Sequence, residues 1–251
     1  MLISLLPEYV VALLSLLALV FINRAAVIST TVYVHRCATH GSLTMKLWVE
    51  KCFRLATWVT TGFNVRKFVA VHRKHHAHTD ELGDPHSPHL EGYWKVQLGN
   101  VIYYIREGSN PETLGKHARD IPSGRFLDSW GLLGPALGTL VLCLLLGPKW
   151  GLITAVVHAF LFVGIEMPLV NALCHTKHRG GYQHFDEPQA ATTYNNKFVA
   201  WLTGGEGLHH THHWRPGRVW LWYTEQERKL DAGSKYIRFM FNLGWVTAIK
   251  E

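Results

Sequence analysis

Long uncharged runs alternate with basic, histidine-bearing segments along this chain of 251 residues. Residues 7–22 are almost uninterruptedly apolar, residues 130–147 carry no charge, and residues 151–174 carry only Glu166. Because about 20 apolar residues cross the hydrocarbon core of a membrane, the last two runs predict a transmembrane hairpin at about 128–173. The first run continues to Val34 and predicts one span at about 8–34. A cleaved signal peptide is the alternative for this run, but its start has no basic residue.

The remaining segments, 35–125 and 175–251, contain most of the basic residues behind the formal net charge of +7. By the positive-inside rule both face the cytoplasm, and the hairpin tip faces away. The pattern predicts an all-α, multi-pass membrane protein in which residues 1–251 form one domain with a cytoplasmic cap. Within the first segment, Leu47 to Val71 shows helical spacing typical of a helix that lies at the membrane interface or is partly buried beneath it.

Basic composition alone also fits nucleic-acid binding, but the sequence contains no DNA- or RNA-binding motif. Polar loops beside anionic lipid explain the excess of positive charge more simply. The four cysteines form no C-x-x-C pair, so neither a disulfide framework nor a zinc ribbon is indicated.

Seventeen histidines occur in the chain, and most of them lie in clusters. Two H-x-x-H-H triplets are present, and on a helix the positions i, i+3 and i+4 lie on one face. Each triplet therefore directs three imidazoles toward one point. The triplets are His72, His75 and His76, and His209, His212 and His213.

Two further pairs lie near the cytoplasmic ends of the predicted spans. Asn171 and His175 share a helical face at i and i+4. His35 and His40, five residues apart, share a face less well, so we expect the helix to break near Gly41 and turn His40 back. Nine imidazoles are too many for one metal ion but suit two, and imidazole binds Zn, Cu, Fe and Ni.

With these residues, the chain resembles the membrane fatty acid desaturases, in particular the delta-9 acyl-CoA and acyl-lipid type. "HRCATH" (35–40) is similar to their first histidine box, "VAVHRKHHAHTDELGDPHSP" (69–88) to the second, and "GEGLHHTHH" (205–213) to the third. "VNALCH" (170–175) resembles the segment that supplies a further histidine and an asparagine acting through water.

The resemblance implies an O2-dependent desaturase with two iron ions (Fe2+/Fe3+) bound almost wholly by imidazole. It gives Asn171 a water-mediated contact with the metal. An unactivated methylene needs a strong oxidant, which side chains alone cannot supply. The implied iron ligands are His35, His40, His72, His75, His76, His175, His209, His212 and His213. The implied partners are membrane lipid, a fatty acyl substrate and an external electron donor such as ferredoxin, rubredoxin or cytochrome b5 with its reductase.

The chain departs from the family pattern at several positions. There is room for about one span before the first box, where the family commonly has two. His210 stands where asparagine is usual, and we expect it to support the ligands from behind. Ala70-Val71 replaces the Arg-Asp of animal acyl-CoA members, so CoA, acyl carrier protein and intact lipid all stay open as carriers. Candidate contacts for a carrier phosphate are Arg66, Lys67, Arg106, Lys116 and Arg119.

Three side chains within or beside the apolar runs add expectations of their own. Trp58 and Phe63 are candidates for lining an acyl tunnel, with plain core packing as the alternative. Glu166 lies inside a predicted span, where a carboxylate is costly and usually has a partner. We expect it to support the site or to contact substrate, unless it lies hydrated near the interface.

Other functions remain open at this point. The same centre could act as a hydroxylase or as an acetylenase, which forms a triple bond. The substrate of either reaction could be bound to acyl carrier protein. A histidine-rich metal transporter is a more remote alternative, which requires ionisable residues paired within the spans. A non-catalytic scaffold gives no reason for nine histidines at ligand spacing.

Overall fold

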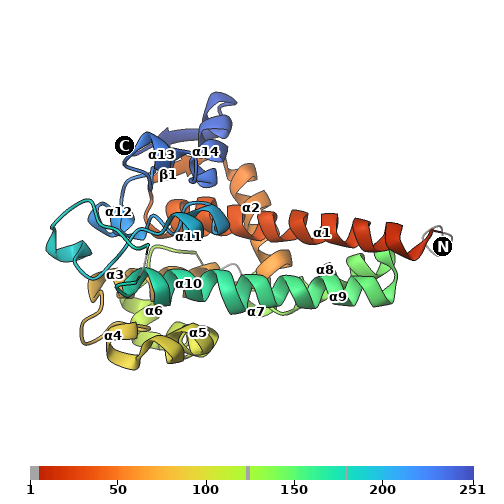
Figure 1. The fold of residues 1–251 in the computed structure, drawn as a ribbon, viewed down its shortest axis with the longest axis horizontal. Coiled ribbons are helices and arrows are strands. Elements are labelled where there is room, and N and C mark those ends of the chain that lie inside the picture. Colours follow the sequence, from red (N-terminus) through yellow and green to blue (C-terminus); the bar gives the residue numbers. More distant parts are fainter. Residues whose placement is uncertain (1–5, 123–124, 179) are drawn as a thin grey trace.

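The computed structural model describes residues 6–122, 125–178 and 180–251. It is an elongated helical stalk joined to a broader cap, with the N-terminal end of the described chain at the tip of the stalk and the C-terminus on the cap (Figure 1). The stalk is made of α1 (Glu8–Ile28), α8 (Leu133–Leu146) and α9 (Pro148–Ala159).

Two stalk helices run on without a break into the cap. Helix α1 continues as the π-helix η2 (Ser29–Thr39), and α9 continues through η3 (Phe160–Glu166), α10 (Met167–Ala172) and η4 (Leu173–His175). Within the described residues, these two continuous helices, of 32 and 28 residues, are the ones long and apolar enough to cross a membrane. At 1.5 Å per residue, α1 alone extends about 31 Å, the thickness of a hydrocarbon core.

Helices α8 and α9 form a hairpin within the predicted segment, and its crossing of a membrane stays a prediction. Gly147 makes the turn with a φ of 81°, and Pro148 begins α9 at the position where a missing N–H costs nothing. A Cβ at Gly151 would lie 2.5 Å from the Cys143 backbone, so glycine allows the two helices to approach closely.

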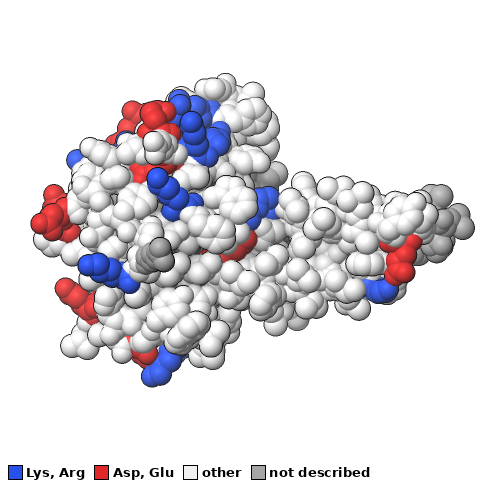
Figure 2. All heavy atoms as spheres, in the orientation of Figure 1, with Lys and Arg blue, Asp and Glu red and all other residues white. Residues whose placement is uncertain are grey.

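The outer surface of the stalk is apolar. Leucines such as Leu16, Leu17, Leu140 and Leu144 are more than half exposed, and an exposed apolar surface of this kind fits lipid rather than water. Figure 2 shows charged side chains over the cap and at the free end of the stalk, with an uncharged stretch between. Together these features indicate association with a membrane.

The predicted single helix from Leu47 to Val71 is wrong, because two helices occupy this segment. Helix α2 (Leu47–Thr61) ends at Gly62, whose φ of 69° lies in the left-handed region that favours glycine. Asn64 then caps α3 (Val65–Ala77) by accepting a hydrogen bond from the Lys67 N–H. The break lets α3 turn away from the stalk and carry its histidines into the cap.

Apart from the 16-residue α5, the remaining helices have 11 residues or fewer. With α5 included, they are α4 (Pro88–Glu91), α5 (Tyr93–Gly108), α6 (Pro111–His117), α7 (Arg125–Ser129), η5 (Pro188–Ala190), α11 (Lys197–Leu202), α12 (His209–Trp214), α13 (Glu225–Arg228) and α14 (Ala232–Asn242). The chain is mostly helical, as predicted, but a two-stranded antiparallel sheet was not expected. It pairs β1 (Leu43–Met45) with β2 (Val246–Ile249). The largest buried cluster packs η2 and α3 against this sheet and α14.

Candidate metal centre

Both H-x-x-H-H triplets lie on short helices in the interior of the cap. Helix α3 carries His72, His75 and His76, and α12 begins at His209 and carries the second triplet. The triplets meet directly, because the Nε2 atoms of His212 and His76 are 2.9 Å apart and those of His75 and His213 are 3.4 Å apart.

His35 and His40 share a face for a reason that the sequence analysis missed. They lie on the π-helix η2 and at its end, where hydrogen bonds join residues five apart. The His40 N–H donates to the His35 carbonyl at 3.1 Å, and the two ring centroids are 4.8 Å apart. The helix does end here, but the π-helical turn, rather than a break near Gly41, brings the rings together.

The nine predicted histidines form two groups. In each group the candidate ligand atoms lie within 4.8 Å of one another. The five-histidine cluster consists of His35, His40, His72, His76 and His212, and the four-histidine cluster consists of His75, His175, His209 and His213. In the four-histidine cluster, the His209 Nε2 lies 2.8 Å from that of His175 and 3.1 Å from that of His213.

Three buried carboxylates contact the back of these rings. Glu206 accepts a hydrogen bond from the His35 Nδ1 at 2.8 Å, Asp84 from that of His75 at 2.9 Å, and Asp80 from that of His175 at 2.8 Å. Each bond fixes the ring with its Nε2 directed into a cluster, the arrangement by which outer carboxylates orient metal-binding histidines. No role was predicted for these acids, although the sequence shows each one within a few residues of a histidine triplet.

Burial controls the ionisation of the clusters. It lowers the pKa of six imidazoles well below the usual value, and the neighbouring rings lower it further. The six are His40, His72, His76, His209, His212 and His213. Neutral imidazole is the form that binds metals.

The carboxylates remain charged in the same surroundings. Burial alone would raise the pKa of the Asp80 carboxyl, but hydrogen bonds from His175 and Ser87 hold it at about 2. In the same way, His35 holds the pKa of Glu206 below its usual value against the effect of burial. The clusters therefore combine neutral donors with a negatively charged surround, which favours a cation.

The three remaining predicted residues lie outside both clusters. The Asn171 Nδ2 donates to Asn100 at 2.8 Å, and both amides line a cavity beside the histidines. His210 is buried and bridges two backbone groups of the 185–193 loop, with its Nδ1 on the Ala190 carbonyl and its Nε2 accepting from the Phe185 N–H. Glu166 is buried and is bound by Arg24 at 3.0 Å and Asn23 at 3.2 Å, so it ties the two long helices together.

A cavity of about 370 Å³ borders both clusters. His35 and His72 of one and His209 of the other line it, and Phe63 and Met167 contribute apolar wall. Phe63 therefore lines a cavity beside the histidines, and its role in an acyl tunnel stays a prediction. Trp58 is buried and donates its indole N–H to the Trp130 carbonyl at 3.0 Å.

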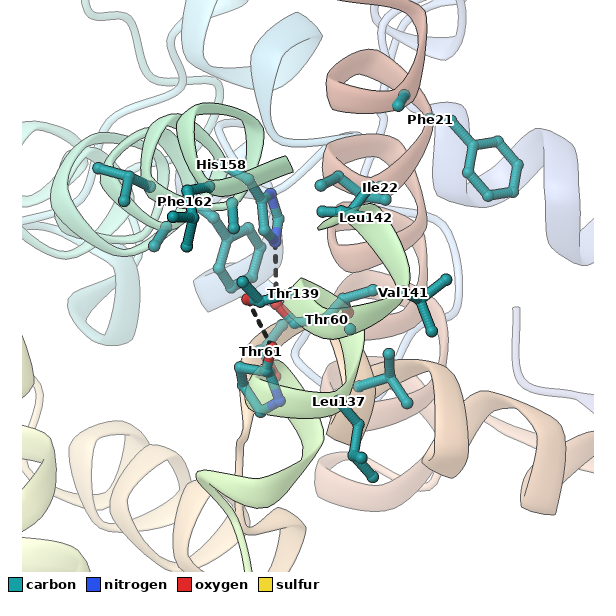
Figure 3. Close-up of a pocket in the computed structure, with 18 of the residues that line it drawn as sticks. Phe21, Ile22, Thr60, Thr61, Leu137, Thr139, Val141, Leu142, His158 and Phe162 are labelled. Atoms are coloured by element: carbon teal, nitrogen blue, oxygen red, sulfur yellow. Dashed lines mark hydrogen bonds between the residues drawn. The ribbon is translucent and has the colours of Figure 1, made fainter. Parts of the chain in front are cut away.

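A second cavity, of about 650 Å³, lies between α1, α2, α8 and α9 (Figure 3). Its walls are mostly apolar, and the polar His158 is held by its Nε2–H on the Thr60 carbonyl at 2.9 Å. Thr61 and Val163 line both cavities, so the two adjoin. Most of the residues that line the stalk cavity are apolar, and the other cavity has both apolar and histidine walls.

Comparisons with known proteins agree with this geometry. The family model for fatty acid desaturases matches residues 9–243. An acyl-CoA 5-desaturase of Anemone leveillei is 31% identical over 89% of this chain and 68% of its own length. An sn-1 stearoyl-lipid 9-desaturase of Synechocystis is 28% identical over 89% of this chain and 67% of its own. A palmitoyl-monogalactosyldiacylglycerol delta-7 desaturase of Arabidopsis thaliana is 28% identical over 88% of this chain and 57% of its own length. This chain therefore belongs to the fatty acid desaturase family and is an oxidoreductase of lipid metabolism.

Proposed function

We propose that this protein is an O2-dependent membrane acyl desaturase that binds two iron ions through nine histidines. The observation that carries the proposal is the division of nine imidazoles, six of them on fully buried residues, into a five-histidine and a four-histidine cluster. The names of the relatives, which specify acyl-CoA or acyl-lipid desaturases, support the reaction class.

The donor set fits iron. Imidazole is a ligand for iron as for other first-row metals, and burial keeps the rings neutral. The His40 Nε2 is buried without a hydrogen-bond partner among the described residues, and His40 belongs to the five-histidine cluster. A bound cation would satisfy this otherwise costly atom. We assign the nine histidines as iron ligands and Asn171 as the residue that holds a metal-bound water.

Two bound irons would supply the redox chemistry for activating O2. The overall reaction removes two hydrogen atoms from –CH2–CH2– to leave –CH=CH–. These two hydrogen atoms, together with two electrons from the donor and two protons from solvent, reduce O2 to two molecules of water. The electrons come from a separate redox protein such as ferredoxin, rubredoxin or cytochrome b5.

The protein positions the acyl chain and excludes water. The chain lies in the cavity bordered by His35, His72 and His209, and its methyl end extends into the stalk cavity of Figure 3. Rigid walls fix which methylene pair faces the clusters, because a misplacement of about 1 Å greatly lowers a rate. Glu206, Asp84 and Asp80 keep the orientation of the His35, His75 and His175 rings fixed during the reaction.

The proposed setting is an integral, multi-pass membrane protein. The two continuous helices that begin with α1 and α9 cross the bilayer, the shorter α8 packs against α9 within it, and the basic cap lies on the cytoplasmic side. This orientation places the clusters where a soluble electron donor has access.

Expression in cells that supply an electron donor tests the function. Mass spectrometry of the lipids should show a new unsaturated acyl chain with wild-type protein and none with His212→Ala or His75→Ala, one variant for each cluster. Both variants should still be present in the membrane fraction. An unchanged lipid profile with wild-type protein, or zinc as its bound metal, would contradict the proposal, and full activity of either variant would contradict the ligand assignment.

A further inference from the structure

The cavity that borders the clusters reaches the surface at an apolar mouth. Three of the residues that line it are exposed, namely Val101 (40%), Ile105 (57%) and Leu132 (87%). Val101 and Ile105 belong to α5, and Leu132 immediately precedes α8. Exposed apolar side chains of α5 and of the segment before α8 therefore form part of the cavity wall.

Helix α5 presents an apolar stripe to its surroundings beside this mouth. Trp94, Leu98 and Ile102 are each at least 70% exposed, and together with Ile105 they recur at intervals of three or four residues. This spacing places them on one helical face. Helix α5 packs against α10 at the end of the stalk (Figure 1). Such a face on a helix next to apolar stalk helices is typical of one that lies in a membrane interface.

Positive charge is absent from the cavity wall. Within the described part of the chain, none of its lining residues is lysine or arginine. Two of the cations expected to bind a carrier phosphate are engaged elsewhere, since Arg66 donates to the Ala118 carbonyl and Arg119 to the Gly115 carbonyl. Arg106 follows the lining residue Ile105 and stacks on Tyr103 at 4.9 Å, and neither Arg106 nor Tyr103 lines the cavity.

We infer that the substrate is an acyl chain still esterified to a membrane glycerolipid, which enters sideways from the bilayer through the mouth formed by Val101, Ile105 and Leu132. This inference rests on the proposed function and specifies its carrier. An apolar mouth beside a lipid-facing helix admits a chain without moving it through water. A carrier such as CoA or acyl carrier protein would instead set a highly charged group against this rim, with no cation on the cavity wall to receive it.

A carrier comparison in proteoliposomes tests the inference. Full-length, iron-loaded protein with an electron donor is given one deuterium-labelled stearoyl chain in three forms: phosphatidylcholine in the bilayer, the CoA thioester and the acyl carrier protein thioester. Mass spectrometry identifies the labelled product while it is still on its carrier. We expect the phosphatidylcholine ester to react at least ten times faster than either thioester.

Two matched variants locate the entrance. Leu132→Glu places a charge in the mouth, whereas Leu82→Glu places the same charge at an equally exposed leucine (87%) on a cap loop. An acidic residue just before α8 is compatible with a helix N-terminus, so the fold should tolerate it. Leu132→Glu should lower kcat/KM for the lipid ester at least tenfold with unchanged iron content, and Leu82→Glu should match wild type. Ile105→Glu repeats the test from α5.

Each outcome decides the inference. A thioester that reacts as fast as the lipid ester, or a Leu132→Glu variant as active as Leu82→Glu, overturns it and leaves the desaturase function intact. If iron-loaded protein converts none of the three forms, the proposed function fails, and this inference fails with it.

Discussion

Replacing Asp84 by asparagine should weaken metal binding at one cluster only. Asp84 is fully buried and accepts three hydrogen bonds: from the His75 Nδ1 at 2.9 Å and the Asp80 N–H at 2.8 Å on one oxygen, and from the His86 N–H at 3.0 Å on the other. Asparagine has one carbonyl oxygen and one NH2 group. In either orientation, at least one of these donors faces an NH2 group instead of an acceptor.

The size of the effect follows from this geometry. A buried donor without an acceptor costs about 1–3 kcal/mol. Loss of an outer carboxylate that orients a ligand lowers metal affinity about 10- to 100-fold, or about 1.4–2.7 kcal/mol. The two ranges agree, and both concern His75 of the four-histidine cluster. The five-histidine cluster keeps its own carboxylate, Glu206 on His35.

Metal retention during chelator titration measures this effect. Wild-type protein should lose its two irons over a similar range of chelator, whereas Asp84→Asn should lose one iron at a chelator concentration 10- to 100-fold lower. Glu206→Gln is the matched control for the five-histidine cluster and should also release one iron early, and the double variant should release both. Equal retention by wild type and Asp84→Asn, or simultaneous loss of both irons from either single variant, would refute this reasoning.

Three further changes test other parts of the structure. In metal-free protein, burial lowers the pKa of six histidines, so below their unfolded pKa of about 6.5 the unfolded state binds more protons than the folded state. Each group then lowers the stability by about 1.4 kcal/mol for every pH unit below that value. The thermal midpoint should therefore fall between pH 7 and pH 5, and a constant midpoint would contradict the burial. Glu166→Gln should keep its iron and lose about 1–3 kcal/mol of stability, because Glu166 contacts Arg24 rather than the clusters. Measurable loss of iron from this variant would contradict a purely structural role of Glu166. Gly134→Ala should destabilise by about 3 kcal/mol or more, since its Cβ would lie 2.1 Å from the Trp58 carbonyl oxygen. Gly115→Ala is the control, because a Cβ there meets open space. It should change the free energy of unfolding by about 1 kcal/mol or less.

Much of the candidate site could be predicted because helical spacing acts locally. The i, i+3, i+4 pattern of each triplet fixed which imidazoles share a face before any tertiary contact was known. Their division into a set of five and a set of four could not be predicted in this way, because it depends on how α3, α12 and η2 cross. The π-helical turn at His40 was missed for a related reason, since five-residue spacing reads as a mismatch on an α-helix.

The sequence predicted those parts of the fold that long apolar runs determine. It did not predict the parts that depend on single residues. The hairpin follows from composition and the turn at Gly147. The break at Gly62 depends on one left-handed residue and one capping asparagine inside an otherwise helical pattern. The pairing of β1 with β2 joins short segments about 200 residues apart, which no local pattern indicates.

A single-turnover measurement tests the central claim most directly. Iron-loaded protein in bilayers that contain a labelled stearoyl lipid is reduced chemically, freed of excess reductant and exposed to O2, and the product is quantified against bound iron. We predict two irons per chain, about one new double bond per two irons, and no product from His213→Ala. Equal product from iron-free protein, or a hydroxylated or acetylenic product in place of the alkene, would contradict desaturation at a two-iron histidine centre.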